Sequence, residues 1–319
     1  MIFKYLLIKY LLIAATLLTG CAAYAQTSSL VMLMEIPPGI SILSGDQGLI
    51  IPQPTNSWSV TPSWTTDGRI IFISDRSNTR QIWITNSSGV ATQIGNLPGP
   101  IQAGRPQMGR DGTVIFSATT ATTVPNSNET IFVMNSDGSG LRELTQGMQP
   151  SIAPSGKWIA FTRQTDVPYH RQIFRINVDG TGEHQLTDLG DTNYPDANAA
   201  SISPDETQIA IFSGKEQDRV NPQNQSLFTY GYRNVAVIPA TGGPRVLLTA
   251  CKPVTTQAEL QATTVCIVAD NPAWTPDGKS MIFDIMFKSA NETWMINTDK
   301  TNFSRYYSRL RGVVGVALK

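Results

Sequence analysis

Aspartates recur in this chain within one short sequence pattern. Asp67, Asp111, Asp205 and Asp277 each stand in a polar stretch between two short apolar runs, and Ser155 occupies a fifth such position. A carboxylate at such a place can act as a general acid or base, or it can accept hydrogen bonds from the backbone amides of a tight turn. A catalyst does not need near-copies along one chain, so we expect Asp277, in the stretch "TPDG", to shape a turn.

Other groups that could do chemistry are few. The chain has two histidines, His170 and His184, and no His-x-x-x-His spacing that would predict a zinc site. No Gly-x-Ser-x-Gly motif predicts a hydrolase nucleophile. Asp188, Asp191 and Asp196 could bind Ca²⁺, although their spacing lacks the glycine and the terminal glutamate of an EF-hand loop. We expect no catalytic residue, no metal and no cofactor, with calcium as the alternative.

The first 25 residues have the composition of a targeting segment, with Lys4 and Lys9 before a short apolar run. Two cleavage sites compete. Leu18-Thr19-Gly20-Cys21 fits a bacterial lipobox, in which residues 1–20 are removed and Cys21 is lipidated, whereas Ala23-Tyr24-Ala25 fits an ordinary signal peptidase site that removes residues 1–25. A retained anchor is a third reading, but the apolar run is too short to span a bilayer comfortably. Either cleavage predicts an exported protein, as a periplasmic or outer-membrane lipoprotein or as a soluble periplasmic or secreted protein.

Cys251 and Cys266 are the cysteines left after either cleavage. An even pair in an oxidising compartment favours a disulfide, with two free thiols as the alternative. Closing a loop of this length would stabilise the fold by about 3 kcal/mol. No histidine or further cysteine lies near the pair in sequence, so a metal site is not expected there.

Composition excludes some partners and bounds the domain count. The chain carries 24 basic and 24 acidic residues and therefore has no electrostatic footprint for nucleic acid or for an anionic membrane surface. An apolar fraction of 41%, with 25 Gly and 20 Pro, is typical of a globular protein rich in turns. We expect one domain over residues 26–319, monomeric, with a lipid anchor as its only membrane contact.

Internal repeats decide the fold class. A motif of strand, polar turn and strand recurs in register five times, as "PSWTTDGRIIFIS" from 62, "PQMGRDGTVIFSA" from 106, "PSIAPSGKWIAFT" from 150, "ASISPDETQIAIFS" from 200 and "PAWTPDGKSMIFD" from 272. Each copy is followed by two further apolar stretches, and three tails end in Leu-Thr, at residues 144–145, 186–187 and 248–249. Each unit is thus predicted to form four short antiparallel strands, which we name a to d from first to last.

Four-stranded units of this period predict an all-β fold, a six-bladed β-propeller of four-stranded antiparallel blades. Residues 29–43 are expected to supply strands c and d of the sixth blade and residues 303–318 its strands a and b, so that both chain ends close the ring in one composite blade. Trp64 and Trp274, on strand a, are expected to pack between blades rather than to bind a ligand.

The recurring Pro-Asp turn resembles the WD-like repeat of TolB-like six-bladed β-propellers, which also occurs in the propeller domains of prolyl oligopeptidases. The resemblance covers nearly the whole mature chain and implies a propeller fold. It does not extend to the α/β domain that precedes the propeller in TolB, because repeat-like sequence here begins within a few residues of the cleavage sites. The repeat-like sequence also leaves no room in the chain for the hydrolase domain that the peptidases carry.

Long insertions are predicted on one face of the propeller. The a-b and c-d turns share one face, which we call the turn face, and the b-c and d-a loops share the opposite loop face. The long segments all belong to the loop face, at 118–129, 163–171, 214–233, 188–198 and 250–270. Candidate binding residues there are Arg105, Gln149, Tyr169, His170, Arg171, Asp196, Asn198, Tyr230, Tyr232, Arg233 and Asn271. Four of them precede strand a in four blades and are expected near the mouth of the central channel: Arg105, Gln149, Asn198 and Asn271.

Two function classes follow from these observations. The first is a non-enzymatic binding or scaffold protein of the bacterial cell envelope that holds an envelope protein or a glycan on its loop face. The second is a lyase or hydrolase of polysaccharide or peptide with its site at the channel mouth. The scarcity of catalytic motifs favours the first class.

Overall fold

The computed structural model describes residues 30–318 except for 37–38, 45–46, 87, 98–101, 120–128, 167–169, 189, 191–193, 221–226, 252–266, 269–271, 288–289 and 309–312. The regular elements within this part of the chain are β-strands. None of the described residues forms a helix long and apolar enough to cross a membrane. An all-β fold is therefore confirmed.

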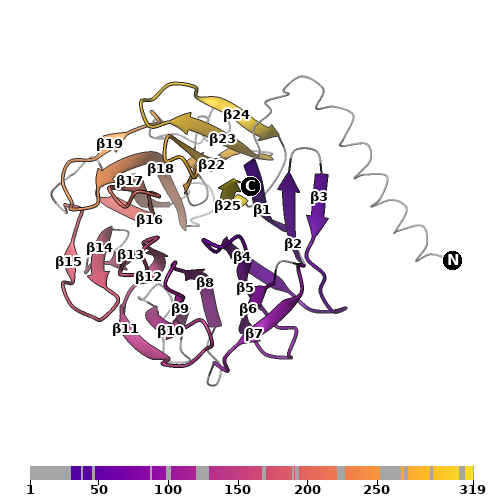
Figure 1. The fold of residues 1–319 in the computed structure, drawn as a ribbon. Coiled ribbons are helices and arrows are strands. Elements are labelled where there is room, and N and C mark those ends of the chain that lie inside the picture. The colour runs from indigo at the N-terminus through magenta and orange to yellow at the C-terminus, as the bar shows by residue number, and fades with distance from the viewer. Residues whose placement is uncertain are drawn as a thin grey trace.

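Six antiparallel sheets are arranged in a ring (Figure 1). Five of them use consecutive stretches of chain, and we number them blades 1 to 5; the closing sheet joins the two ends of the chain. Blade 1 comprises β4 (Ser59–Trp64), β5 (Ile70–Ser74), β6 (Gln81–Thr85) and β7 (Ala91–Ile94); blade 2 comprises β8 (Gln102–Met108), β9 (Thr113–Thr119), β10 (Thr130–Asn135) and β11 (Arg142–Gln146). Blade 3 comprises β12 (Met148–Ile152), β13 (Trp158–Gln164), β14 (Arg171–Asn177) and β15 (His184–Gln185); blade 4 comprises β16 (Asp196–Ile202), β17 (Gln208–Val220), β18 (Leu227–Pro239) and β19 (Val246–Leu247).

Blade 5 departs from the predicted four strands. It contains β20 (Ile267–Val268), β21 (Ala273–Trp274), β22 (Ser280–Phe287), β23 (Ala290–Asn297) and β24 (Ser304–Ser308). Both β20 and β21 pair with β22, so the inner position of this sheet is divided between two short strands. The propeller fold is confirmed, but the count of six four-stranded blades is wrong, because five of the described sheets have four strands and this one has five.

The closing sheet also differs from its prediction. Its order is β25 (Val313–Leu318), β1 (Leu30–Ile36), β2 (Gly39–Ser44) and β3 (Gln47–Ile50), so the C-terminal segment supplies one strand and the N-terminal segment three. Residues 304–308 form β24 instead, antiparallel to β23 on the outer edge of blade 5. The tight turn at Asn297–Lys300 returns the chain directly along β23, so β24 cannot also serve the closing sheet.

Hydrophobic cores lie between neighbouring sheets. The b-strand aromatics Phe72, Phe116, Phe161, Phe212 and Phe283 are all buried. One cluster joins blades 1 and 2, others join blades 2 and 3, 3 and 4, and 4 and 5, and a further cluster places Ile40 and Ile51 of the N-terminal segment against blade 1. A small sheet thus buries its faces only when its neighbours are present, which is why the repeat specifies a ring.

Four inner strands carry the same backbone irregularity. Thr61, Arg105, Gln149 and Ala199 have positive φ angles of 48°, 50°, 52° and 57°. In each strand the pairing register shifts at this residue, which is the mark of a β-bulge. Arg105 and Gln149 therefore lie within their strands rather than before them, and the fourth equivalent residue is Ala199, not the predicted Asn198.

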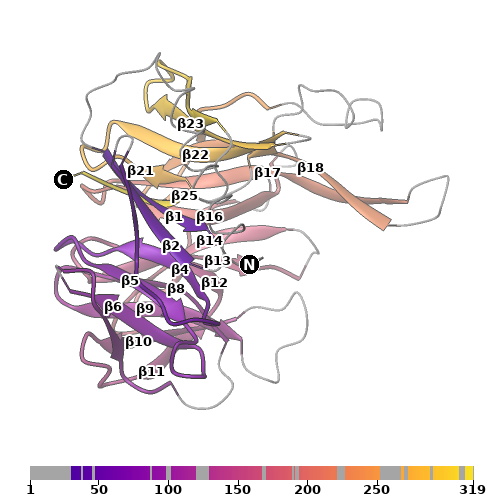
Figure 2. The same ribbon diagram turned by 90° about the vertical axis from the view of Figure 1, so that its right-hand side faces the viewer.

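The predicted loop at 214–233 is largely a β-hairpin arm. β17 and β18 continue their antiparallel pairing from Gln208↔Pro239 out to Val220↔Leu227. β16 follows β17 only as far as Gly214, so the outer part of the arm is a two-stranded ribbon. Figure 2 shows this arm projecting beyond the other strands. The polar sequence of 215–219 suggested a loop, but the continuous ladder with 228–232 stabilises strands there.

Candidate binding site

The aspartates of the a-b turns accept hydrogen bonds within their own turns. Asp277 Oδ1 accepts from the Thr275 hydroxyl at 2.7 Å and from the Lys279 amide at 3.0 Å. These two donors hold the pKa of the Asp277 carboxyl below its usual value. Asp205 accepts equivalent bonds from Ser203 and Thr207, again with a lowered pKa. The predicted turn role of Asp277 is confirmed.

Glu206 stands where the other four a-b turns have glycine, and its contacts explain the exception. Its φ of 62° is a conformation that glycine adopts more easily. The Glu206 carboxylate accepts from the Ser155 amide at 2.6 Å, the Ser155 hydroxyl at 3.1 Å and the Trp158 indole at 3.0 Å. The strained backbone is thus offset by three hydrogen bonds that fasten blade 4 to blade 3.

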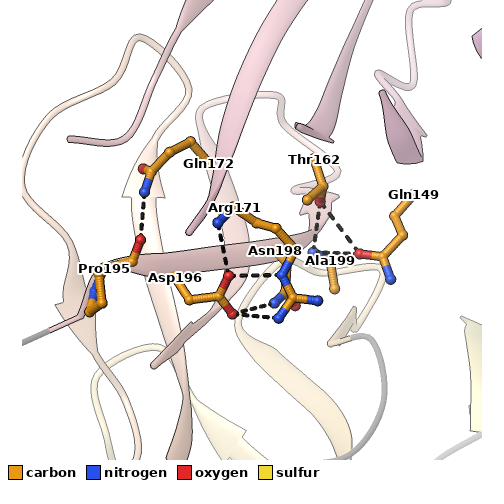
Figure 3. A network of polar contacts seen from close by, with 8 residues as sticks. All are labelled: Gln149, Thr162, Arg171, Gln172, Pro195, Asp196, Asn198 and Ala199. Carbon is orange, nitrogen blue, oxygen red and sulfur yellow. Dashed lines mark hydrogen bonds and ion pairs between the residues drawn. The ribbon is translucent and has the colours of Figure 1, made fainter. Parts of the chain in front are cut away.

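On the loop face, Arg171 and Asp196 form an ion pair between blades 3 and 4 (Figure 3). The Asp196 carboxylate is 1% exposed and accepts from Arg171 Nε and Nη2, both at 2.8 Å. It also accepts from the Arg171 amide at 3.1 Å and from Asn198 Nδ2 at 2.8 Å. A buried carboxylate with this many donors is satisfied inside the protein, so Arg171 and Asp196 join two blades and Asn198 supports Asp196 from the same strand.

Gln149 lies beside this ion pair and also bonds across the blade boundary. Its Oε1 accepts from the Ala199 amide at 3.1 Å, and the Thr162 hydroxyl lies 3.4 Å away. At the same boundary, Gln172 Nε2 of blade 3 donates to the carbonyl of Pro195, which directly precedes β16 of blade 4, at 2.7 Å. The structure therefore places four predicted residues at one blade boundary: Arg171 and Asn198 both bind Asp196, whereas Gln149 bonds to Ala199 and Thr162 (Figure 3).

The other loop-face candidates that the structure describes lie on blades 2, 3 and 4. The Arg105 amide donates to Thr61 Oγ1 at 3.3 Å, between blades 2 and 1. His170 and Arg233 are partly buried. Tyr230 and Tyr232 lie on the arm, opposite Gln217 and Lys215 in the ladder. Tyr169 and Asn271 lie outside the described residues, and for these candidates binding stays a prediction.

The structure separates the acidic residues weighed for calcium. Asp188 is exposed and accepts from the Gly190 amide at 2.8 Å, Asp196 is paired with Arg171, and Asp191 lies outside the described residues. Where the chain is described, no three His, Cys, Asp or Glu side chains gather as a metal site would require. Calcium stays a prediction without a described site.

Cys251 is buried and disulfide-bonded. Its amide donates to Asn234 Oδ1 at 2.6 Å, which fixes the start of the cysteine loop to blade 4. Cys266 lies outside the described residues, so its pairing with Cys251 stays a prediction.

A cavity of about 420 Å³ lies at the opposite end of the inner strands, toward the turn face. Its walls come from the C-terminal halves of the inner strands and from the a-b turns of blades 1 to 5. Small polar side chains recur two residues after the bulge position in four blades, as Ser63, Gln107, Ser151 and Ser201. Pro154, Pro204 and Pro276 of the a-b turns line it as well.

Hydrogen bonds between blades shape this cavity. Gln107 Oε1 accepts from the Ile152 amide at 3.0 Å, and Ser151 Oγ accepts from the Ile202 amide at 3.2 Å. Trp274 Nε1 donates to the Ser201 carbonyl at 2.8 Å, which confirms its predicted role between blades. The corresponding Trp64 packs against Ile40 and Ile70 and lines the cavity, but its buried Nε1 has no hydrogen-bond partner among the described residues.

The described lining residues carry one charge, that of Arg110, and include no histidine or carboxylate. Such a wall offers hydroxyl, amide and indole groups for binding but no general acid or base. The sequence did hold a signal for this site, since a serine or glutamine recurs just before the a-b turn. The same residues fit an ordinary inner strand equally well, so the pattern alone does not predict a cavity.

Comparison with known proteins gives the fold. A scan of protein families finds no match to the sequence, and a search of curated proteins finds none either. Among solved structures, a TolB from Acinetobacter baumannii is similar over 91% of this chain and 66% of its own, with a TM-score of 0.61 and 18% identity. A putative TolB from Agrobacterium tumefaciens aligns over 90% of each chain, with a TM-score of 0.60 and 13% identity.

An oligogalacturonate lyase from Vibrio parahaemolyticus is also similar, over 88% of this chain and 74% of its own, with a TM-score of 0.51 and 10% identity. Binding proteins and enzymes can share this architecture, so the likeness carries no activity with it. At these identities the comparisons show a fold alone: the chain is a β-propeller similar to those of the TolB structures.

Proposed function

We propose that this protein is an exported, non-enzymatic binding protein of the bacterial cell envelope, which holds a segment of a partner in the cavity at its turn face. The cavity carries the proposal. Its volume, about 420 Å³, lies within the range of about 300–1,000 Å³ common for ligand sites. Export rests on the composition of residues 1–25, and Cys21 is its proposed lipid anchor.

The lining chemistry indicates the kind of segment bound. Serine hydroxyls and the Gln107 amide can exchange hydrogen bonds with peptide groups, while Trp64 and the turn prolines offer apolar contact. A single positive charge at Arg110 gives little electrostatic selectivity. An uncharged, extended stretch of an envelope protein fits this wall, and a glycan chain is the alternative occupant.

Acid-base catalysis in the cavity is not proposed. A lyase or hydrolase acting there would need a group that can move a proton, and the described lining residues include no histidine or carboxylate. The sequence suggested the loop face as the binding surface. Four of its candidates, Gln149, Arg171, Asp196 and Asn198, make hydrogen bonds within the protein instead. This leaves the arm and the remaining loop residues as its binding groups.

Ser63→Phe tests the cavity. The Ser63 hydroxyl makes only a long contact, 3.5 Å, with the neighbouring Trp64 carbonyl, so the larger ring fills cavity space at small structural cost. Affinity purification from membranes with quantitative mass spectrometry should show at least a tenfold loss of the partner. Ser88→Phe, at an exposed position of the β6–β7 turn, is the matched control and should retain it. An identical partner profile for both variants would contradict the proposal.

Lipid anchoring has its own test. Metabolic labelling with a clickable palmitate analogue should mark the wild-type protein and not Cys21→Ser. A mature N-terminus at Gln26 without acyl label would remove the anchor while leaving the cavity proposal intact.

A further inference from the structure

Trp58 is held rigidly at the surface of blade 1. Its side chain is 54% exposed, which makes it one of the few large apolar side chains that face solvent among the described residues. Its amide donates to Asp75 Oδ1 at 2.6 Å, and its carbonyl accepts from the Ser74 hydroxyl at 2.8 Å and from the Asp75 amide at 3.2 Å. Three hydrogen bonds thus fix the backbone of Trp58, while its indole faces solvent.

Arg76 lies next to this tryptophan and is partly buried. Its guanidinium lies over the rings of Phe72 and Trp83, 5.0 Å from each centroid. Nε donates to Ser74 Oγ at 3.2 Å and Nη2 to Ser59 Oγ at 3.3 Å. Both serines are at least 98% buried, and Ser74 is the same residue that binds the Trp58 carbonyl. A buried serine pair therefore links the arginine to the tryptophan backbone.

No carboxylate neutralises Arg76 within the described part of the chain. The neighbouring Asp75 uses Oδ1 for the Trp58 amide, and the remaining guanidinium N–H groups have no acceptor among these residues. Burial without a compensating charge lowers the pKa of Arg76 from its usual value. A partly desolvated arginine that lacks an anion is an unusual arrangement, because charged groups away from water are generally paired.

Blade 3 contains a similar stack with an anion present, although its arginine stands two residues after Phe161 in β13 and Arg76 stands four residues after Phe72, beyond the end of β5. Arg163 lies over Phe161 and Phe174, with its guanidinium carbon 5.1 and 4.6 Å from the ring centroids. Its Nη1 binds Glu183 Oε1 at 2.7 Å. The aromatic pairs correspond in the two blades, since Phe161 faces Phe174 and Phe72 faces Trp83 in the same ladder.

The residue that corresponds to Glu183 in blade 1 is an alanine. Gln185 faces Phe174 and Gln93 faces Trp83, so the residue two positions earlier is Glu183 in blade 3 and Ala91 in blade 1. Blade 1 thus has an arginine stacked on the corresponding aromatic pair, but it has no carboxylate at the position of Glu183. A carboxylate from another molecule can take that place.

We propose that Trp58 and Arg76 form a second docking site, on the loop face of blade 1, for an acidic segment of a partner protein. A partner carboxylate binds the free edge of the Arg76 guanidinium, and an adjacent apolar side chain packs on the Trp58 indole. Tryptophan and arginine are the residues most enriched at the energetic centres of interfaces, and charge-assisted arginine–carboxylate bonds are among the stronger ones. This site lies at the opposite end of blade 1 from the cavity, and it does not depend on the cavity binding anything.

The test replaces Trp58 with the photocrosslinker p-benzoylphenylalanine in the full chain, expressed in cells. Irradiation should join the protein to one partner, and mass spectrometry should place the link within a few residues of an Asp or Glu. Arg76→Gln in the same protein should reduce the crosslink at least tenfold. Arg80→Gln, the same change at an exposed position of the same loop, is the matched control and should leave it unchanged.

A synthetic copy of the crosslinked partner segment completes the test. Fluorescence polarisation with purified protein should show at least tenfold weaker binding when the acidic residue becomes its amide, and weaker binding as salt rises. Arg76→Lys should bind with intermediate affinity, because lysine keeps the charge but loses the planar fork. Overturning results are the absence of any crosslinked protein, a crosslink to lipid or glycan, equal crosslinking in Arg76→Gln and Arg80→Gln, or an acid-to-amide peptide that binds as well.

Discussion

Polar residues at the two ends of the inner strands differ in charge and in the space around them. At the loop face, Gln149, Arg171, Asp196 and Asn198 are bonded to one another or to backbone across the boundary of blades 3 and 4. At the turn face the small polar residues are uncharged and line a cavity of about 420 Å³; Gln107 and Ser151 also bond across blade boundaries, whereas the Ser63 hydroxyl makes only a 3.5 Å contact within its own strand. A charged residue near the channel is therefore no guide to a binding surface, whereas a repeated small residue can be.

This difference has a physical origin. The bulge in each inner strand places a backbone amide at positive φ, and the one in blade 4 is satisfied by Gln149 of the preceding blade. Side chains near the bulge are thereby drawn into contacts between blades. Beyond the bulge the strand returns to regular pairing, and short side chains leave the space of the cavity open. Predictions that break or sharpen this contrast follow, in decreasing order of expected effect.

Asp196→Ala should have the largest effect on stability. It removes the buried carboxylate and leaves the Arg171 guanidinium partly buried without its anion. Breaking a buried ion pair by removing one partner costs about 3–5 kcal/mol, and we expect the lower end because Arg171 is 19% exposed. Urea unfolding measures the change. The double variant Arg171→Leu/Asp196→Leu should lose less than Asp196→Ala, and a loss below about 1 kcal/mol for Asp196→Ala would show that the loop-face network is not structural.

Glu206→Ala should destabilise the propeller by about 1–3 kcal/mol, because the Ser155 amide and the Trp158 indole lose their acceptor. Glu206→Gly loses the same hydrogen bonds but relieves the φ of 62°, so its midpoint of unfolding should lie between those of the wild type and Glu206→Ala. If glycine is as destabilising as alanine, the backbone at this turn is not strained.

Most of the fold could be predicted from the sequence, and the errors in that prediction have identifiable causes. The repeated aromatic and turn positions predicted the blades because each repeat buries the same phenylalanine. The strands of the closing sheet were misassigned because the end segments lack the Asp-Gly turn that marks strands a and b elsewhere. The arm at 214–233 was read as a loop because long-range pairing, not local hydrophobicity, makes it a hairpin.

The candidate site was predicted less well. Arg171 and Asp196 are 25 positions apart in sequence, and neither residue type indicates that its partner is internal. The arginine of the proposed docking site, Arg76, was missed for the converse reason, since only the comparison with Arg163 and Glu183 in blade 3 shows that blade 1 has Ala91 at the position of the carboxylate. Contacts between blades decide whether a polar side chain is hydrogen-bonded within the protein or free to bind a partner. A repeat pattern does not predict these contacts.

Ser63→Phe should change stability by less than about 1 kcal/mol, in contrast to Asp196→Ala. Its hydroxyl satisfies no other group except through the 3.5 Å contact, and the new ring occupies open cavity space. Thermal unfolding followed by circular dichroism measures the shift. A loss comparable to that of Asp196→Ala would mean that the turn-face residues are as structural as those of the loop face, and the contrast between the two ends would fail.

Asp277→Asn should have the smallest effect, within about 0.5 kcal/mol at pH 7, because the amide oxygen can still accept from Thr275 and Lys279. The pH dependence is more informative than the size. The pKa of Asp277 is lowered in the folded protein, so its contribution to stability is present above the ordinary value of 3.8 and is lost as the pH falls through the folded value. The difference in unfolding midpoint between wild type and Asp277→Asn should therefore shrink as the pH is lowered from 5 toward 2. A difference that stays constant over this range would show that the carboxylate charge contributes nothing to the turn, and that any acceptor of similar shape would fold it equally well.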